Sequence, residues 1–550
     1  MALSPTEVHV DSSKLDNTSD LAKIDYNGAT DVVKQKQETL REAFDADPGI
    51  PFFSPRALQF AYIVAVVLCC SGDAGYDGTV MSAISSMVQY QQYFNLQAAS
   101  SKTGIVFGIY TIGQIASFLT CATLPDWFGR RWGMLLGNLC LVTGSVVTAN
   151  VNAMPMFIAG RFLTGLGTST AGVSARSYLA EITSPATRGR YVGLLNSFFY
   201  VGQIIASGIA IPTGRYSDNM PWRAPIYVQG LPAVINVVLV LGLPESPRWL
   251  YTNGKTQQAT QILAKYHSKN NDINSPMIQL QLAEIEESIS PDGSDRRWWD
   301  FRPLFKTRAD RYRIWLVTLV AAGSSWAGNG LLTNYLTILL NQAGITDPDR
   351  QRVLNFVNSV TSFIGALLGT ASVDYVGRRT IVLTAIFACG TGRQRNARVI
   401  IAGLLSTAGT NVAQANAGIS FIFLFMVFFS YGWTPMQALY PVEVMSYEGR
   451  AKGLAWYTLI SQGTNCVNTF AMPVALANIQ WKTYIIFGVF DFCLLGVVWY
   501  YFVEPKQLTL EEMDQVFASD NPRLTSLELQ RVAKERRRTL KLRHMEKAAV

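Results

Sequence analysis

Charged residues are scarce in this sequence, and their scarcity narrows the class of protein. Aspartate, glutamate, lysine and arginine make up only 15% of the 550 residues, whereas 49% are hydrophobic and the mean hydropathy is +0.18. A chain with so little charge lacks the polar surface of an ordinary soluble domain, and its varied composition excludes a fibre. The composition therefore predicts a protein that crosses a membrane several times.

The basic residues do not point to nucleic acid. The formal net charge is +8, but lysine and arginine fall in short clusters between apolar runs, as in the cytosolic loops of membrane proteins. We therefore expect a lipid bilayer around the chain and no nucleic acid as a partner.

Histidine and cysteine are rare as well. The three histidines, His9, His267 and His544, lie outside the apolar runs, so a proton path through a membrane has to use carboxylates. All seven cysteines lie inside apolar segments, which favours small core residues and predicts neither disulfides nor a metal site. Because no nucleophile and base stand together, we expect no enzyme activity and no cofactor.

Long apolar runs are abundant. There are twelve of them, each near the length that crosses about 30 Å of hydrocarbon, and they predict an all-α membrane protein with six spans on each side of a long polar stretch. The runs lie at about 58–80, 104–124, 133–149, 155–176, 190–211 and 225–243, and at about 314–340, 353–373, 380–408, 418–439, 453–477 and 484–503.

The runs divide the chain into five parts. These are a cytosolic N-terminal tail at 1–56, a six-helix bundle at 57–243, a cytosolic linker at 244–312, a second six-helix bundle at 313–503 and a cytosolic C-terminal tail at 504–550. The linker contains an amphipathic stretch at 279–287, so it should form short helices. Because the arginine-rich loops all fall on one side of the predicted membrane, the positive-inside rule places both termini in the cytosol.

One stretch conflicts with this pattern. Residues 390–398 carry Arg393, Arg395 and Arg398 inside the ninth run. Three arginines at about 2.5–3.5 kcal/mol each outweigh ten apolar residues at about 0.3–0.6 kcal/mol each. Two explanations stay open: 390–398 is an insertion, such as a gene-model or splicing artefact, or the span starts at Val399 and the arginines reach the headgroups.

The two halves repeat a pattern of charged loop residues. The motif DWFGRR at 126–131 follows the second span, and DYVGRR at 374–379 follows the eighth. A second matched set follows the fourth and tenth spans: Glu181 with Arg188, and Glu443 with Arg450. Matching positions in both halves indicate an internal duplication about an axis along the membrane normal.

With these motifs the sequence resembles the sugar porter branch of the major facilitator superfamily, from about residue 56 to 517. Four short sequence motifs are similar to those of fungal lactose permease-like and hexose transporters: PESPRWL at 244–250, WAGNG at 326–330, GWTP at 432–435 and YPVE at 440–443. The resemblance implies the major facilitator fold of two six-helix bundles, with short helices in the central cytosolic loop. It also implies alternating access, a monomeric functional unit and a plasma-membrane location.

The first span carries two acids, Asp73 and Asp77. An ionised side chain at the centre of a membrane helix costs roughly 2.5–3.5 kcal/mol, so an acid there needs a partner, a proton or water. Alternatively, the helix ends nearby and both acids reach headgroup water. We expect Asp73 to be a wetted or structural acid.

Asp77 has a candidate partner. Proton-coupled members of the resembled family pair the acid of a Gly-Tyr-Asp motif with an arginine of the fourth span, which matches Asp77 and Arg161. Arg161 stands among apolar residues, where a carboxylate partner lowers its cost; the alternative is that it snorkels to the interface. We expect Asp77 and Arg161 to form the proton-coupling pair.

Binding a neutral sugar requires amide and hydroxyl groups and aromatic faces with little net charge. Residues of this kind inside the spans are the candidate substrate-binding set: Asn196, Gln203, Ser325, Asn329, Trp433, Tyr440 and Asn468. The alternative for each polar residue is hydrogen bonding between helices, which contributes less than about 2 kcal/mol.

The sequence departs from the resembled family at two places in the spans, and again at 503–507 near the C-terminus. Ser324 and Ser325 stand where many sugar porters carry two glutamines, and Ala438 stands where a tryptophan often stacks on the ligand. Shorter side chains imply either a larger pocket, suited to a disaccharide such as lactose or cellobiose, or a low affinity.

The charged residues at the cytosolic loops are expected to form salt bridges that hold one conformation and break in the other, or else to be simple topological anchors. The set is Asp126, Arg130, Arg131, Glu181, Arg188, Glu245, Arg248, Asp374, Arg378, Arg379, Glu443 and Arg450.

The function predicted from the sequence is sugar:proton symport of a hexose or disaccharide, with the sugar and protons as the small-molecule partners. An uncoupled sugar facilitator is the first alternative. A non-transporting sugar sensor is the second, although only 47 residues follow Val503 and sensors of the resembled family tend to have long tails.

Overall fold

The structure is a computed structural model that describes most of the chain. The described residues are 47, 49–51, 53–85, 87–94, 101–184, 187–216, 220–289, 301–342, 345–390, 412–446, 450–479, 482–506 and 510–531. Most of the predicted N-terminal tail, and the stretch at 391–398 for which an insertion was considered, lie outside them.

The described chain is helical. Its first half contains α2 (Pro55–Ser85), α3 (Val88–Tyr93), α4 (Ser101–Ala116), α5 (Phe118–Trp127), α6 (Arg130–Ala149), α7 (Met154–Ile182), α8 (Arg188–Thr213) and α9 (Met220–Val240). The linker contains α10 (Pro247–Thr252), α11 (Thr256–His267), α12 (Pro276–Ile289) and the short η2 (Arg302–Phe305). The second half contains α13 (Arg308–Trp326), α14 (Asn329–Gln342), α15 (Pro348–Val376), α16 (Arg378–Gly390), α18 (Val412–Val444), α19 (Arg450–Asn478), α20 (Lys482–Tyr501) and α21 (Leu510–Ala518).

Each of the twelve predicted spans falls on a helix or on two consecutive helices, the ninth being described only to the end of α16. Seven helical segments among the described residues have the length and mean hydropathy of a membrane span, and one of them, Gly104–Trp127, runs through α4 and α5. The second span is divided into α4 and α5, and the seventh into α13 and α14. Gly328 lies in this second break with φ +84°, a left-handed conformation that glycine adopts without strain.

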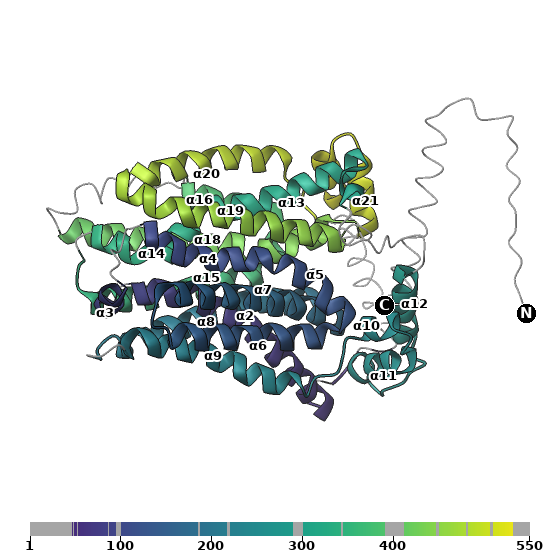
Figure 1. The fold of residues 1–550 in the computed structure, drawn as a ribbon. Coiled ribbons are helices and arrows are strands. Elements are labelled where there is room, and N and C mark those ends of the chain that lie inside the picture. Colours follow the sequence, from purple (N-terminus) through teal and green to yellow (C-terminus); the bar gives the residue numbers. More distant parts are fainter. Residues whose placement is uncertain are drawn as a thin grey trace, which may run out of the picture.

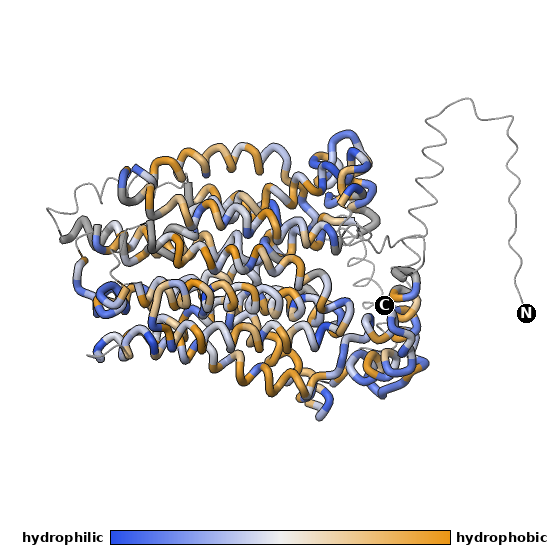
Figure 2. Tube along the Cα trace, viewed as in Figure 1, coloured by the Kyte–Doolittle hydropathy of each residue, from blue (hydrophilic) through white to orange (hydrophobic). Residues whose placement is uncertain are grey.

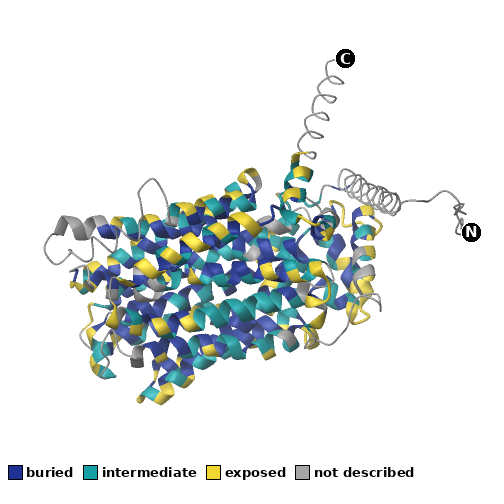
Figure 3. Ribbon diagram, turned by 90° about the horizontal axis from the view of Figure 1, so that it is seen from above, coloured by how far each residue is buried: buried dark blue, intermediate teal, exposed yellow. Residues whose placement is uncertain are grey.

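The outward faces of the helices are apolar. Along α9, Leu231, Val234, Ile235 and Val238 recur at helical spacing and are 44–63% exposed. Hydrophobic residues dominate the middle of the long helices, while hydrophilic residues gather at their ends (Figure 2), and exposed positions lie along the outside of the array (Figure 3). An apolar face of this extent fits lipid rather than water.

The long helices pack within each half and between the halves. In the first half α6 lies against α7 and α9, and α2 against α8; in the second half α15 lies against α18, and α13 against α19. The halves meet where α8 contacts α15, α4 contacts α19 and α2 contacts α14. This arrangement of two helix bundles is the predicted fold class (Figure 1).

The linker helices α10, α11 and α12 lie at the same end of the array as α21, and α3 lies at the opposite end (Figure 1). Asp47 ties this linker to the start of α2. Its carboxylate accepts hydrogen bonds from the Lys269 backbone N–H at 2.7 Å and from the Ser275 hydroxyl at 2.9 Å. Arg56 donates to the carbonyl of Lys269 at 2.6 Å, so the entry to the first span and the linker form one hydrogen-bonded unit.

Candidate functional site

A buried ion pair joins the first and fourth spans. Arg161 Nη1 on α7 lies 2.6 Å from Asp77 Oδ1 on α2, and the two side chains are 3% and 0% exposed. Gln229 Nε2 on α9 donates to the same oxygen at 2.6 Å, and Thr168 Oγ1 donates to Oδ2 at 3.4 Å. The Tyr110 ring lies 4.8 Å from Arg161 Cζ. Asp77 and Arg161 therefore neutralise each other in the interior, and Arg161 does not snorkel to the interface.

Gln229 and Thr168 were not among the residues predicted from the sequence. Gln229 stands between two prolines of α9, Pro225 and Pro232, and an amide inside a largely apolar span is the signal that could have identified it. Both residues hold the Asp77 carboxylate in place when it is ionised.

Asp73 is more buried inside the protein than the sequence predicted. It is 3% exposed, and neither carboxylate oxygen has a hydrogen-bond partner among the described residues. Of the two expectations for Asp73, the wetted acid is wrong, because α2 continues to Ser85 and Asp73 lies well inside the helix, and the structural acid stays a prediction.

Asn196 and Gln203 lie on the face of α8 that meets the second half. Asn196 Nδ2 donates to the carbonyl of Thr434 on α18. One turn further along α8, the Tyr200 hydroxyl lies 2.8 Å from Thr434 Oγ1, and Ser207 Oγ lies 3.4 Å from Ser359 Oγ on α15. Gln203 falls between Tyr200 and Ser207 on this stripe and is 4% exposed, so it is positioned between the halves.

The break between α13 and α14 brings together the predicted polar residues of the second half. Ser325 Oγ lies 3.4 Å from the carbonyl oxygen of Ser461 on α19, and Asn468 Nδ2 donates to the Ser325 carbonyl at 3.4 Å. A Cβ atom on Gly330 would come within 2.5 Å of Asn468 Nδ2, so a larger residue at position 330 would displace the Asn468 amide. Asn329 begins α14, where its Oδ1 accepts a hydrogen bond from Thr333 at 3.0 Å.

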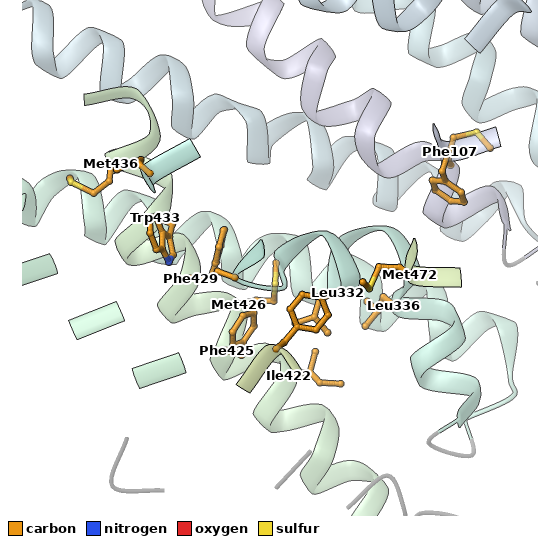
Figure 4. Packing of buried hydrophobic residues seen from close by; sticks show 14 of the residues in the cluster. Phe107, Leu332, Leu336, Ile422, Phe425, Met426, Phe429, Trp433, Met436 and Met472 are labelled. Carbon is orange, nitrogen blue, oxygen red and sulfur yellow. The ribbon is translucent and has the colours of Figure 1, made fainter. Parts of the chain in front are cut away.

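Trp433 takes part in the packing of α18. It is 1% exposed and lies on the same helix as Phe425 and Phe429, among buried apolar side chains (Figure 4). Its ring also packs on α13, because a Cβ atom on Gly323 would lie 3.3 Å from Trp433 Cη2. Packing accounts for this tryptophan, so we leave it out of the sugar site.

The prediction that Tyr440 binds substrate needs correction. Its hydroxyl donates to the carbonyl of Val503 at 3.1 Å, and its ring stacks on Phe502 with 4.0 Å between centroids. In the first half, Tyr178 donates to the carbonyl of Pro244 at 2.8 Å. Each tyrosine precedes the repeated glutamate by three residues, so Tyr440 belongs to the duplicated charged cluster.

In the first half that cluster is built around Arg130, at the start of α6. Its guanidinium lies 3.1 Å from Glu181 and 3.0 Å from Asp126. The Glu245 carboxylate accepts hydrogen bonds from the backbone N–H groups of Arg130 at 2.9 Å and Arg131 at 3.2 Å. Burial raises the pKa of Glu245, although these hydrogen bonds oppose that rise.

The second half repeats this geometry around Arg378, at the start of α16. Arg378 Nη2 lies 2.7 Å from Glu443. Glu504 accepts the backbone N–H groups of Arg378 at 2.8 Å and Arg379 at 2.9 Å, which makes it the equivalent of Glu245. Glu504 is the first residue of the predicted C-terminal tail, and comparison of the two repeats could have identified it as a member of the cluster.

Four further residues were predicted to belong to this charged cluster. The side chains of Arg188, Asp374 and Arg450 lie outside the described residues. Arg248 lies in α10, next to Trp249, whose indole Nε1 donates to the carbonyl of Asp126 at 2.9 Å. This bond connects the linker to the end of the second span.

Two similar helical halves, a broken seventh span and a neutralised charge pair in the interior define a membrane transporter of the major facilitator type. The chain belongs to the family of sugar (and other) transporters, whose family model matches residues 63–517.

Individual relatives are similar over most of their length. A high-affinity glucose transporter of Kluyveromyces lactis is 27% identical over 488 residues, covering 84% of this chain and 86% of the relative. The transporter oryC of Aspergillus oryzae is 27% identical over 472 residues, covering 84% and 86%. Among solved structures, the proton:xylose symporter XylE bound to 6-bromo-6-deoxy-D-glucose superposes with a TM-score of 0.66 at 19% identity, covering 83% of this chain and 98% of that one. The structural likeness supports the fold.

Proposed function

We propose that this protein is a sugar:proton symporter that works by alternating access as a monomeric unit in the lipid bilayer, with both termini in the cytosol of a plasma membrane. The observation that carries the coupling is the ion pair of Asp77 and Arg161, at 2.6 Å in the interior. The K. lactis relative, a glucose transporter, supports a sugar as the substrate. Transport leaves the sugar chemically unchanged, so no catalytic residue is assigned.

Protonation of Asp77 is the coupling step. A neutral Asp77 no longer balances Arg161, so the pair is weakened and the relative stability of the two conformations changes. A paired Asp77 favours one conformation and a protonated Asp77 favours the other, which links proton movement to reorientation.

The energy available to such coupling is substantial. One proton that crosses 100 mV releases about 2.3 kcal/mol, and one pH unit adds about 1.36 kcal/mol. Together these support an accumulation of several hundred-fold, which an uncoupled facilitator cannot reach.

The sugar site in this proposal uses neutral hydrogen-bonding groups between the halves. Asn196 and Gln203 contribute from α8, and Ser325, Asn329 and Asn468 contribute from the α13–α14 break and α19. Amide and hydroxyl groups suit a neutral polyol. Because they come from both halves, a bound sugar contacts both bundles.

The cytosolic cluster acts as the gate in this proposal. The residues around Arg130 and Arg378, with Glu245 and Glu504, hold the ends of the spans together in one conformation and separate in the other. Arg188, Arg248, Asp374 and Arg450 are expected to join this cluster.

Uptake into proteoliposomes with an imposed pH gradient tests the proposal. A panel of hexoses, pentoses and β-linked disaccharides identifies the substrate, and accumulation above the external concentration demonstrates coupling. Uptake that only equilibrates supports an uncoupled facilitator. Sugar binding without uptake supports a sensor.

A further inference from the structure

A stripe of polar side chains continues from the ion pair along the contact between α2 and α9. At one end Gln229 Nε2 donates to Asp77 at 2.6 Å, and at the other end Asn236 Nδ2 donates to Cys70 Sγ at 2.9 Å. Gln229 and Asn236 are seven residues apart on α9, as are Asp77 and Cys70 on α2. The two helices therefore run antiparallel with matched polar faces, and Asp73 lies on α2 between the two contacts.

Four oxygen atoms along this stripe have no hydrogen-bond donor among the described residues. Among the described residues, no partner is found for Asn138 Oδ1, Asn236 Oδ1 or either oxygen of Asp73, and the three residues are 0–3% exposed. The orientation of each asparagine amide is fixed by the hydrogen bonds that its Nδ2 atom donates. Asn138 Nδ2 donates to the Met134 carbonyl at 2.9 Å, and Asn236 Nδ2 donates to the Val66 carbonyl at 3.3 Å. These acceptor oxygens therefore require additional hydrogen-bond donors.

A protonated Asp73 supplies one. The charged group that acts on Asp73 electrostatically is the like-charged Asp77, one turn further along α2; Asp73 in turn acts on the thiols of Cys69 and Cys70. About one turn before it on α2, Cys70 is contacted by the uncharged Asn138 on α6 and Asn236 on α9, and the Arg161 guanidinium on α7 is bound to Asp77. An ionised Asp73 would therefore be buried without a counter-charge, which is strongly unfavourable. The favourable arrangement is an ionised Asp77 beside a neutral Asp73.

We propose that Asp73 is a second proton-binding site that receives the proton given up by Asp77. This rests on the proposed symport. In the transfer, the O–H bond of Asp77 breaks and an O–H bond forms on Asp73. Asp77 becomes the carboxylate that pairs with Arg161, and Asp73 becomes the neutral acid. One carboxylate, one carboxylic acid and one guanidinium are present before and after, so the step moves a proton without changing the net charge of the interior.

The spacing suits this transfer. Side chains four residues apart on a helix are about 5–6 Å apart at Cβ, which two carboxyl groups bridge directly or through one water. Asp73 is also one turn nearer to the Pro55 end of α2, which is the cytosolic end in the proposed topology. The relay therefore moves the proton inward, and its later release from Asp73 leaves the site ready to be loaded again.

The test is proton-driven sugar uptake by proteoliposomes containing Asp73→Asn, Asp73→Glu and Asp77→Asn. Asparagine has the size of aspartate but exchanges no proton, so we expect Asp73→Asn to lower the initial rate of proton-driven uptake at least about 10-fold and to flatten its pH profile. Sugar exchange at equal pH, which needs no net proton movement, should change less than about 2-fold. Asp73→Glu should recover most of the driven uptake, because it restores a carboxyl group.

The controls separate the possible failures. Ser174→Ala removes another buried hydroxyl of the first half, which donates to the Thr170 carbonyl at 2.8 Å, and it should leave the pH profile unchanged. Wild-type rate and pH profile in Asp73→Asn overturn the relay, as does equal loss of exchange and driven uptake in both Asp73 variants. If Asp73→Asn does not fold, unchanged pH dependence in a folded Asp73→Glu protein also overturns it. Accumulation that persists in Asp77→Asn overturns the symport itself.

Discussion

Glu245 and Glu504 perform the same task at equivalent places in the two halves. Each carboxylate accepts hydrogen bonds from two consecutive backbone N–H groups, at the N-termini of α6 and α16 respectively. Both helices begin after a glycine of positive φ, Gly129 at +106° and Gly377 at +103°. The duplication therefore extends from sequence motifs to hydrogen bonds.

Because the two glutamates are equivalent, Glu245→Gln and Glu504→Gln should lower the free energy of unfolding equally. Each change weakens charge-assisted bonds to helix N-termini, and we expect each to lower the free energy of unfolding by about 1–3 kcal/mol. Thermal unfolding of the purified proteins measures this. Glu528→Gln, at an exposed position, is the control and should have no effect. A large loss in one variant with none in the other contradicts the equivalence.

Removing Arg161 alone should be more damaging than removing the whole pair. Arg161→Leu leaves the Asp77 carboxylate buried without its counter-charge, at an expected loss of about 3–5 kcal/mol in the free energy of unfolding. The double variant Asp77→Asn/Arg161→Leu should regain much of that loss. Unfolding of the four proteins forms a double-mutant cycle, and strictly additive losses would show that the two residues do not interact.

Tyr440→Phe should affect stability rather than substrate affinity. It removes the hydrogen bond to the Val503 carbonyl, so we expect a loss of about 1 kcal/mol in the free energy of unfolding and an unchanged KM for the sugar. Tyr178→Phe is the matched variant in the first half. A tenfold rise in KM for Tyr440→Phe alone would return this tyrosine to the sugar site.

Gln203→Ala should raise the KM for the sugar about tenfold, the value of one hydrogen bond to a neutral ligand. Its pH dependence of uptake should stay unchanged, because Asp77 and Arg161 are intact. Ser207→Ala is the control on the same face of α8, where the hydroxyl already donates to the Gln203 backbone carbonyl at 2.7 Å. Equal KM changes in both variants would argue against a direct contact between Gln203 and the sugar.

The link between Asp47 and the linker should weaken in acid. Burial raises the pKa of Asp47, but hydrogen bonds from Ser268, Ser275 and the backbone of Lys269 and Gly49 outweigh it, so the net pKa lies below the ordinary 3.8. Its stabilising contribution is present above pH 3.8 and is lost as the pH falls through the lower, folded-state pKa. Hydrogen exchange at Lys269 should therefore accelerate in that range. Exchange in Asp47→Asn should lack this acid-dependent step.

The sequence was sufficient for the helices and for the pair at the centre of the proposal. Twelve apolar runs predicted the spans, and a lone arginine among apolar residues predicted a carboxylate partner. The resemblance to proton-coupled transporters matched that partner to Asp77, and the structure pairs the two. Both are local signals, because the energy of a charge in lipid is large enough to require compensation.

The burial of individual polar residues and their hydrogen-bond partners could not be predicted from such local signals. Asp73 was expected near headgroup water because the apolar run ends at about residue 80, yet α2 continues to Ser85. Tyr440 was assigned to the sugar site by residue type, although its hydroxyl bonds a backbone carbonyl more than sixty residues away. Contacts of this kind depend on tertiary packing, and only the internal repeat carried a trace of them in the sequence.

The most direct test of the central claim is sugar accumulation by proteoliposomes under an inward pH gradient, comparing the wild-type protein with Asp77→Asn. The account predicts that the wild-type protein concentrates sugar many-fold, and that Asp77→Asn equilibrates sugar without concentrating it while still exchanging labelled for unlabelled sugar. Undiminished accumulation by Asp77→Asn would contradict proton coupling through the Asp77–Arg161 pair.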